Sequence, residues 1–538
     1  LDALPQEYPS LGTGDFRNYA LNIENADGSQ CCNPVYITHE IAAGKYTLKG
    51  LPFVPAEENE AETLKIILED PVTKVELHLL YGVLEKEDII TRSVIIKNAG
   101  KAPVTVKKAQ SACLDFLHGD YDLIKFYGRH AMERNMERMP VSHESTRIGS
   151  RRGTSSHQYN PGVILAGKNT NEDSGSCYGM LFVYSGNFLV EAEKDQYDQT
   201  RIQMGLTDEL FAYPLEAGAE FIAPEVILSY TNKGLSRLSQ QYHHCIMNHI
   251  CQGKYVHANR PVLINSWEAA YFDFTGDTIV ELAKEAKALG IDMVVMDDGW
   301  FGTKYPRVTD NCALGDWVVD TKKLPNGIEG LLNDARKNQV KFGIWIEPEM
   351  TNTTSMLYEK HPDWVIKAPK RDAVLGRGGT QLVLDLSNPK VQDFVFGVVD
   401  NLLTKYPDIA YIKWDANMPI MNHGSQYLSA ADQSHLYIAY HQGFAKVIDR
   451  IRAKYKDVVI QCCASGGGRA NWGMLRGFDE FWVSDNTDAM QRIYMQYGTS
   501  YFFPAIAMAS HISAVPNHTV FRTTSLKYRI DVAMSGRL

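Results

Sequence analysis

The chain has 538 residues, 44% of them hydrophobic and 22% charged, with a formal net charge of -10 and a sequence pI near 5.9. A single core stops growing at roughly 250–300 residues, so at least two domains are expected. An acidic chain with no block of about five basic residues is unlike a nucleic-acid binder, and no run of about 18 apolar residues suggests a membrane span. We therefore expect neither a nucleic-acid nor a membrane partner.

Residues 1–250 are predicted to form an antiparallel β-sandwich. Segments 63–68, 75–81, 89–97 and 104–108 are rich in β-branched residues and partly alternate between apolar and polar positions. The turn residues at 98–103, Asn-Ala-Gly-Lys-Ala-Pro, predict a hairpin between two of these strands.

Residues 255–538 alternate between apolar strands and amphipathic helices. The predicted strands are 262–267, 293–298, 342–347, 382–385, 411–415, 458–463, 481–485 and 503–510, and the predicted helices are 278–289, 328–337, 391–406, 431–455 and 489–497. Asp277 is expected to cap the first helix. Repeated βα units with apolar strands indicate a parallel sheet closed into a (β/α)8 barrel. A doubly wound sheet is the alternative, disfavoured because no Gly-rich phosphate loop follows the first strand.

Acids and tryptophans gather at the ends of the predicted strands, where a barrel enzyme holds its working residues. They are Trp267, Asp297, Asp298, Trp300, Trp345, Glu347, Glu349, Asp385, Trp414, Asp415 and Asp485. Carboxylates bind sugar hydroxyls and perform acid/base work, while indole faces cover the apolar side of a pyranose. Taken singly, each acid is more often a cap or a turn residue; together they favour a sugar site.

Two strand ends carry the sharpest motifs. In Lys413-Trp414-Asp415 the period of two places the ammonium and the carboxylate on one face, where the cation can lower the carboxylate pKa and maintain a nucleophile. A buried ion pair without chemistry is the alternative. Asp485 ends another strand and would serve as acid/base, whereas Asp488 is placed to cap the helix that follows.

These motifs resemble the α-galactosidases (melibiases) of glycoside hydrolase family 36. The similar segments are 12–17 (GTGDFR), 265–268 (NSWE), 297–302 (DDGWFG), 315–317 (GDW), 345–350 (WIEPEM), 413–415 (KWD), the glycine loop 463–469, 484–489 and 510–518. They follow one order across nearly the whole chain. The resemblance implies a β-supersandwich followed by the catalytic barrel, double displacement with retention, and neither a metal nor an organic cofactor.

The resemblance also implies roles for individual residues. Asp415 would be the nucleophile and Asp485 the acid/base. Galactose would be bound by Asp297, Asp298, Trp345, Arg377 and Lys413, with Trp267 and Asn417 also in the substrate site. Asp297 and Asp298 would bond the 4- and 6-hydroxyls. Cys463 and Gly466 would lie beside the 2-hydroxyl and leave little space for an N-acetyl group, which favours galactose.

Several alternatives stay open at this point. Within the family these are an α-N-acetylgalactosaminidase and a raffinose-synthase type of galactosyltransferase. From other classes they are a metal-dependent barrel hydrolase and an inactive sugar-binding protein. The family typically has Arg where this chain has Met418, and Phe-Asp where it has Ala470-Asn471, which bears on the aglycone preference.

The remaining expectations concern the whole protein. The 9 cysteines include two adjacent pairs and form a poor disulfide framework, so a reducing, cytoplasmic location is expected. The family suggests a homotetramer or dimer acting on melibiose-type or raffinose-type α-galactosides. The sequence starts at Leu1 and stops at Leu538, where the family continues into a last barrel segment and a C-terminal β-domain. We therefore expect a fragment of low stability when expressed alone.

Overall fold

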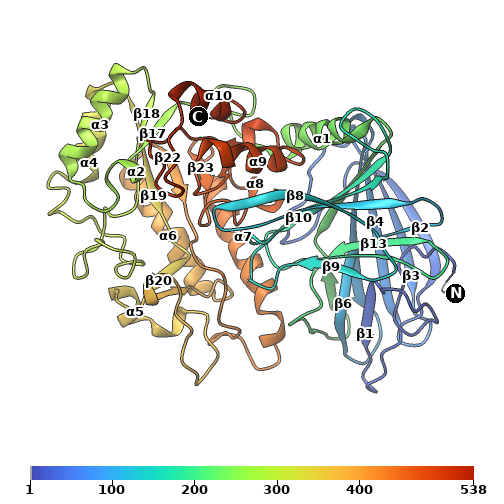
Figure 1. Ribbon diagram of the computed structural model, residues 1–538. Helices are drawn as coiled ribbons and strands as arrows, with labels where there is room; N and C mark the ends of the chain where they lie inside the picture. Colours follow the sequence, from blue (N-terminus) through green and yellow to red (C-terminus); the bar gives the residue numbers. More distant parts are fainter. Residues whose placement is uncertain (1–2, 538) are drawn as a thin grey trace.

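The structure is a computed structural model that describes residues 3–537, and it consists of two halves packed against each other (Figure 1). The blue and cyan N-terminal half contains antiparallel sheets, and the green to red half contains a parallel sheet with helices around it. Both predicted architectures, the β-sandwich and the barrel-type sheet, are present.

The N-terminal half is built from two facing sheets whose inner sides form one core. In β4, Val75, Leu77 and Leu79 are fully buried while the residues between them are partly exposed, which is the period-two pattern of a strand with one face inward. The larger sheet has the order β2 (Val35–Ala43), β3 (Glu62–Glu69), β4 (Val75–Leu84), β5 (Ile89–Asn98), β16 (Glu225–Thr231), β11 (Cys177–Val183), β10 (Tyr159–Gly167), β7 (Tyr121–Arg129) and β8 (Met132–Pro140), with β15 (Glu220–Ile222) also on β5. The smaller has the order β1 (Leu21–Glu24), β6 (Val104–Phe116), β13 (Thr200–Gly205), β12 (Leu189–Lys194) and β9 (Thr146–Gly149), with β14 (Tyr213–Leu215) on β6.

The predicted hairpin at residues 98–103 is wrong. The chain does turn there, but β5 belongs to the larger sheet and β6 to the smaller one, so the turn crosses between sheets. Turn residues predict a change of direction, whereas the sheet that the next strand joins is decided by which apolar face it must bury.

The C-terminal half is organised around seven parallel strands. Their order is β17 (Leu263–Asn265), β18 (Met293–Met296), β19 (Lys341–Ile346), β22 (Ile409–Trp414), β23 (Val459–Cys462), β24 (Glu480–Trp482) and β25 (Met508–Ala509). Every neighbouring pair is parallel, and β18 is buried along its whole length, as expected for a sheet covered on both faces.

The strand predicted at 382–385 lies outside this sheet. It corresponds to β21 (Gln381–Val383), which pairs antiparallel with β20 (Met350–Asn352) in a separate two-stranded sheet. Leu382, Val383 and Leu384 are buried, so the apolar segment does belong to the core. The prediction that it is a strand of the barrel sheet is wrong. Hydrophobicity alone cannot distinguish these two placements.

Helices lie at the five predicted places: α3 (Gly276–Ala288), α4 (Gly327–Lys337), α6 (Pro389–Lys405), α7 (Leu436–Lys454) and α9 (Ala489–Ser500). The structure also contains helices that the sequence analysis did not predict: α1 (Gly234–Cys245), within the range expected to form only strands, and α2 (Trp267–Ala270), α5 (Met356–Lys360), α8 (Trp472–Leu475) and α10 (Leu526–Ala533). The buried stripe of α6, Val391, Val395, Val399 and Leu402, has the helical spacing that directs one face to the sheet.

The helix caps include one correction. Asp488 caps α9 as predicted, because its side chain accepts from the backbone N–H of Gln491. Asp277, in contrast, lies inside the first turn of α3, and Thr275 forms a reciprocal capping box with Thr278.

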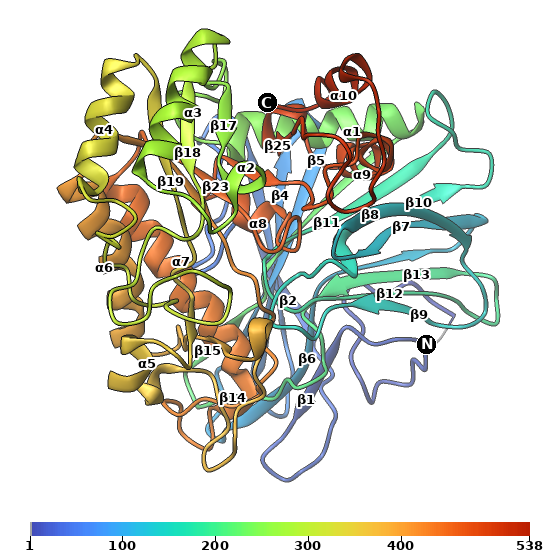
Figure 2. The ribbon, with the colours of Figure 1, turned by 60° about the vertical axis from the view of Figure 1, so that its left-hand side comes forward.

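The two halves share an apolar interface. Phe502 of the barrel packs against Phe126 at 5.6 Å and against Tyr242 of α1 at 5.0 Å between ring centroids, and Tyr242 also meets Trp472 at 5.8 Å. Figure 2 shows β7, β8 and β10 lying next to α9. The sandwich is therefore positioned directly against the elements that follow β23 and β24.

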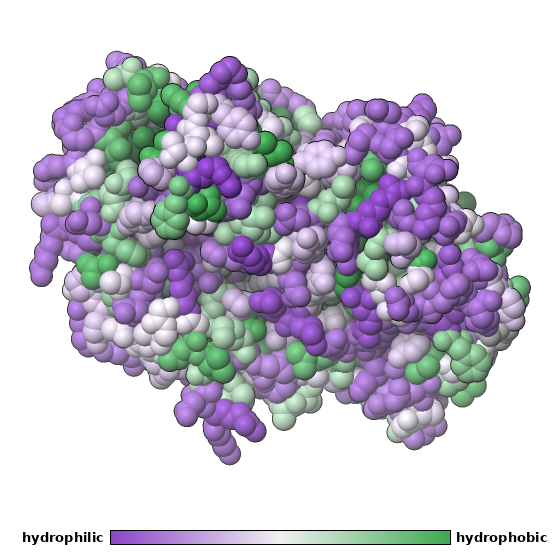
Figure 3. Space-filling model, viewed as in Figure 1, coloured by the Kyte–Doolittle hydropathy of each residue, from purple (hydrophilic) through white to green (hydrophobic). Residues whose placement is uncertain are grey.

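The outer surface is mostly polar on the face of Figure 3, with hydrophobic side chains scattered between hydrophilic ones. Within residues 3–537, none of the helices combines the length and the apolar composition needed to cross a bilayer.

Candidate active site

One large cavity lies along the inner side of the parallel sheet and reaches the carboxyl ends of its strands. Most of the predicted substrate and catalytic residues line it: Trp267, Asp297, Asp298, Trp345, Arg377, Lys413, Asp415, Asn417 and Asp485. Because the carboxyl ends of parallel strands meet at one edge, side chains far apart in sequence converge here.

Asp415 follows β22 and is held by four N–H donors. Its Oδ2 accepts from Trp345 Nε1 at 3.2 Å and from Asn417 Nδ2 at 2.8 Å. Its Oδ1 accepts from the backbone N–H groups of Ala416 at 3.0 Å and Ser465 at 3.4 Å. Asp415 is 6% exposed, so its carboxyl group is held in place by these donors and is accessible from the cavity that it lines.

Lys413 pairs with a different carboxylate from the one predicted. Its Nζ donates to Asp297 Oδ2 at 2.8 Å, and the same oxygen accepts from Asn265 Nδ2 at 2.7 Å. Burial alone would lower the pKa of Lys413, but the charges of Asp297, Cys463 and Asp415 and the hydrogen bond to Asp297 together outweigh it and raise the pKa above the ordinary value. Lys413 is thus a buried cation bonded to Asp297, with Asp415 as a neighbouring charge.

Two arginines hold the other acids near the cavity. Arg307 binds Asp298 through both arms, Nε to Oδ1 at 3.0 Å and Nη2 to Oδ2 at 2.8 Å. Burial raises the pKa of Asp298 in spite of this guanidinium. Arg377 lies 3.2 Å from Asp310 and remains partly exposed, so its guanidinium is available at the cavity mouth.

Asp485 follows β24 and differs from Asp415 in its surroundings. Its side chain is 40% exposed, and its Oδ2 lies 2.8 Å from Nε2 of His130. Burial acts to raise the pKa of Asp485, but the hydrogen bond and charge of His130, together with the charges of Lys413 and Arg377, outweigh burial and lower the pKa. One carboxylate is therefore buried and held by four donors, and the other is accessible and bonded to a histidine.

Cys463 and Gly466 are not among the residues that line the cavity. Cys463 is 2% exposed, and burial raises the pKa of its thiol. Gly466 has φ +81°, and a Cβ there would come within 2.7 Å of the Asp485 backbone nitrogen. Gly466 thus packs closely against the backbone of Asp485.

Glu347 is a buried acid that the sequence places at a strand end but outside the predicted binding set. Its Oε2 accepts from Asn417 Nδ2 at 3.2 Å and its Oε1 from Gln381 Nε2 at 2.9 Å. Burial, followed by the charge of Asp415, raises the pKa of Glu347 to about 8. It orients Asn417, which in turn donates to Asp415.

The cavity is also lined by residues to which the sequence analysis gave no role. Glu268 faces His511 at 3.4 Å and His518 at 3.6 Å, and all three line the cavity. Their motifs were part of the family resemblance, so that signal could have found them. His130 carries no such signal, because it comes from the sandwich.

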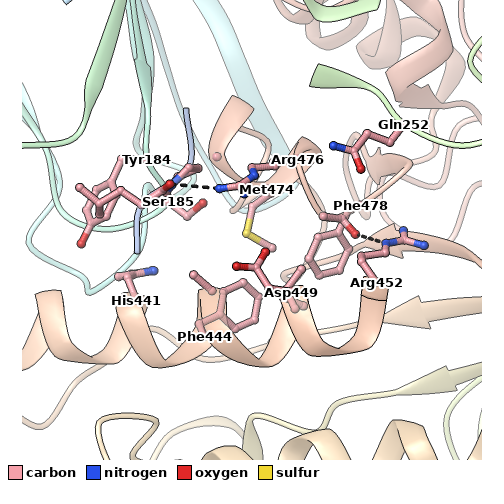
Figure 4. Close-up of a pocket in the computed structure, with 16 residues that line it drawn as sticks. Tyr184, Ser185, Gln252, His441, Phe444, Asp449, Arg452, Met474, Arg476 and Phe478 are labelled. Carbon is pink, nitrogen blue, oxygen red and sulfur yellow. Dashed lines mark hydrogen bonds between the residues drawn. The ribbon is translucent and has the colours of Figure 1, made fainter. Parts of the chain in front are cut away.

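A second cavity lies between α7 and the sandwich (Figure 4). His441, Phe444 and Asp449 point into it from α7, with Tyr184 and Ser185 opposite. Burial lowers the pKa of His441 to about 4, and its ring bonds the carbonyl of Gly153. Among the described residues that line this cavity, Asp449 is the single carboxylate, so it lacks the paired acids of the first cavity.

Across residues 3–537, no three or more His, Cys, Asp or Glu side chains are grouped so that they could hold a metal ion.

Comparison with known proteins places the chain in a family. Residues 220–538 match the family described as Melibiase, and residues 1–216 match the glycosyl hydrolase family 36 N-terminal domain. The bifunctional alpha-galactosidase/sucrose kinase AgaSK of Mediterraneibacter gnavus is 56% identical over 100% of this chain, which spans 56% of that protein. Alpha-galactosidase AgaA of Geobacillus stearothermophilus is 43% identical over 100% of this chain, which spans 73% of AgaA.

Solved structures agree with the sequence comparisons. The galactosidase domain of AgaSK superposes with a TM-score of 0.95 at 56% identity, covering 100% of this chain and 73% of that one. The crystal structure of AgaA gives 0.97 at 43% identity, covering 99% and 74%. On this evidence the chain belongs to glycoside hydrolase family 36, the melibiase family of α-galactosidases.

Proposed function

We propose that this protein hydrolyses terminal α-D-galactose from raffinose-type α-galactosides by double displacement, with Asp415 as nucleophile and Asp485 as acid/base. The observation that carries the proposal is the contrast within one cavity: Asp415 is buried and held by four donors, while Asp485 is accessible and paired with His130. Structures of AgaA variants with raffinose and with stachyose support the substrate class.

In the first step Asp485 gives a proton to the glycosidic oxygen, and a carboxylate oxygen of Asp415 forms a bond to C1 as the C1–O bond to the leaving group breaks. The products are a β-galactosyl ester of Asp415 and the alcohol of the leaving group. In the second step Asp485 takes a proton from water, whose oxygen bonds to C1 as the ester breaks. α-Galactose leaves, and both carboxyl groups return to their starting states.

For sugar binding we propose Asp297 and Asp298 on the 4- and 6-hydroxyls, with Lys413, Arg377, Asn417 and the indoles of Trp345 and Trp267 around the ring. The Lys413–Asp297 and Arg307–Asp298 ion pairs support this, because each fixes a carboxylate at the cavity wall. An acid held by a cation can still accept from a hydroxyl through its remaining lone pairs.

For the whole protein we propose residues 1–250 as the sandwich and 255–538 as the catalytic part, no metal or organic cofactor, and a homotetramer or dimer. The nine cysteines are all free, which supports a reducing, cytoplasmic environment. Two residues that depart from the family pattern make specific contacts in this structure. Met418 packs against Gly376, and Asn471 forms hydrogen bonds with Ser155 and Ser185 of the sandwich.

The test uses the natural protein with raffinose, an aryl α-galactoside and the matching aryl α-N-acetylgalactosaminide. We expect galactose from the first two, with α-galactose as the first anomer seen by proton NMR, unchanged turnover with a chelator, and little reaction with the N-acetyl substrate. β-Galactose as the first product would rule out retention. Preferential cleavage of the N-acetyl substrate would establish the galactosaminidase alternative, and transfer to sucrose in place of water would establish the transferase.

A further inference from the structure

The hairpin of β7 and β8 reaches from the sandwich into the active-site cavity. Figure 1 shows β8 extending below α9 toward the barrel half. At its turn Ala131 has φ +64°, and Arg134 two residues into β8 has φ +51°, both in the left-handed region that few non-glycine residues adopt. The turn places His130 at the cavity wall, 2.8 Å from Asp485.

The hairpin is fixed to the loops that carry the catalytic groups. Buried Arg134 donates to the carbonyl oxygen of Gly467 at 3.0 Å and to Thr499 Oγ1 at 2.6 Å. Asn486, next to Asp485, donates to the carbonyl oxygen of Ala131 at 3.0 Å. Glu133 is 0% exposed and accepts from Ser484 Oγ. The position of His130 is therefore set by bonds on both sides of Asp485.

We propose that His130 is a positioning residue that shares one proton with Asp485, so that the pair, and not the carboxyl group alone, delivers the catalytic proton. This rests on the acid/base assignment proposed above. In the first step the pair loses one proton to the glycosidic oxygen, and in the second it recovers one from the attacking water. The proton count of the pair is the same before and after a turnover.

The charges around the pair agree with this proton count. The hydrogen bond and charge of Asp485 raise the pKa of His130, while the same contact lowers that of Asp485. The pair therefore keeps its last proton to a pH above the ordinary value of 6.5 for histidine, and coupled groups titrate as one unit. The titratable and charged groups facing His130 or Asp485 are Glu133, His157, Arg377, Lys413, Cys463 and Arg492.

The experiment compares pH profiles of kcat/KM for raffinose in the natural protein and in His130→Ala and His130→Gln. Without the imidazole, Asp485 titrates as a single carboxyl group, so we expect the alkaline limb to move to lower pH by at least about one unit. At pH 7.5 the loss for His130→Ala should be about 10- to 100-fold. Gln can still donate to Oδ2 but does not ionise in this pH range, so it should recover the rate near pH 5 and not at pH 7.5.

Two comparisons make the result specific. An aryl galactoside with a strongly acidic phenol needs little protonation, so His130→Ala should cost less than about threefold there. His143→Ala removes a similar exposed imidazole, 3.1 Å from Asp198 and away from the cavity, and should leave the profile unchanged. An unmoved alkaline limb in both His130 variants, or equal losses with both substrates, would overturn the inference.

Asp485→Asn separates this inference from the proposed function. If that variant loses kcat/KM for raffinose but retains kcat/KM for the aryl substrate with the acidic phenol, Asp485 is the acid/base. The His130 profiles then decide the inference alone. If it hydrolyses raffinose normally, the acid/base assignment is wrong, and the inference falls with it.

Discussion

The two halves of the molecule contribute to the active site in different ways. The barrel half supplies chemistry through backbone geometry: Asp415 and Asp485 follow β22 and β24, so parallel strands bring them to one edge. The sandwich half supplies contacts through a single hairpin, whose His130, Glu133 and Arg134 meet the loops after β23 and β24. Both proposed catalytic carboxylates thus belong to one half, while their surroundings are built by both.

This difference separates two kinds of residue that alanine scanning alone would confuse. A barrel carboxylate should affect the rate and leave folding nearly intact. Arg134 of the hairpin should affect folding and rate together, because it bonds buried backbone carbonyl groups next to the catalytic loops. Four predictions test that separation.

The largest effect is expected for Asp415→Asn, which removes the proposed nucleophile but retains the side-chain shape. kcat on raffinose should fall by at least about 10⁴-fold, with a change in unfolding free energy of about 1 kcal/mol or less. Galactose release and thermal melting measure the two quantities. With azide, Asp415→Gly should form β-galactosyl azide; full activity in the Asn variant would remove Asp415 from the mechanism.

Arg134→Met tests the sandwich side. It removes the guanidinium that donates to the buried oxygens of Gly467, Val483 and Thr499, of which Gly467 keeps the backbone N–H of Ala470 as a donor. We expect a loss of about 3 kcal/mol and a lower kcat. Denaturant unfolding and raffinose kinetics check both effects.

Arg138→Met is the matched control, because Arg138 lies in the same strand. It bonds Asp122 and the carbonyl groups of Gly167 and Thr170 inside the sandwich. It should lower stability and leave kcat unchanged. Equal kinetic losses in both variants would show that the hairpin acts only through general stability.

Glu347→Gln tests a buried acid beneath Asp415. Its pKa is raised from 4.5 to about 8, so between these values the folded state holds a proton that the unfolded state has lost. This contribution to stability is complete below about pH 4.5 and is lost as the pH rises through 8. Gln does not ionise, so its stability relative to the natural protein should increase by up to about 4 kcal/mol from pH 5 to 8.5. A pH-independent difference would argue against the raised pKa.

The smallest effect is expected for a residue that does not line the active-site cavity. Thr275→Ala removes the capping box of α3 and should cost about 1 kcal/mol without changing kcat. Asp277→Ala, at the position first predicted as the cap, should cost less. The order would reverse in thermal melts if Asp277 were the cap after all.

The sequence predicted the features that follow from local pattern. Strand ends, the period of two and the motif order located Asp415 and Asp485, and nearly all proposed binding residues line one cavity. The failures arose where several placements satisfy one pattern: β21 is apolar but outside the barrel sheet, and Lys413 bonds Asp297 although Asp415 is closer in sequence. His130 had no local signal, because its partner Asp485 is 355 residues away.

The hairpin turn also limits how this chain can vary in length. Side chains in a strand alternate between faces, so one inserted residue near the turn would direct His130 away from Asp485 and exchange the positions of Glu133 and Arg134. Gly128 tightens the limit, because a Cβ there would lie 2.2 Å from the carbonyl oxygen of Met132. Insertions and deletions in functional relatives should therefore avoid residues 128–134 and collect in the sandwich turns that face away from the barrel.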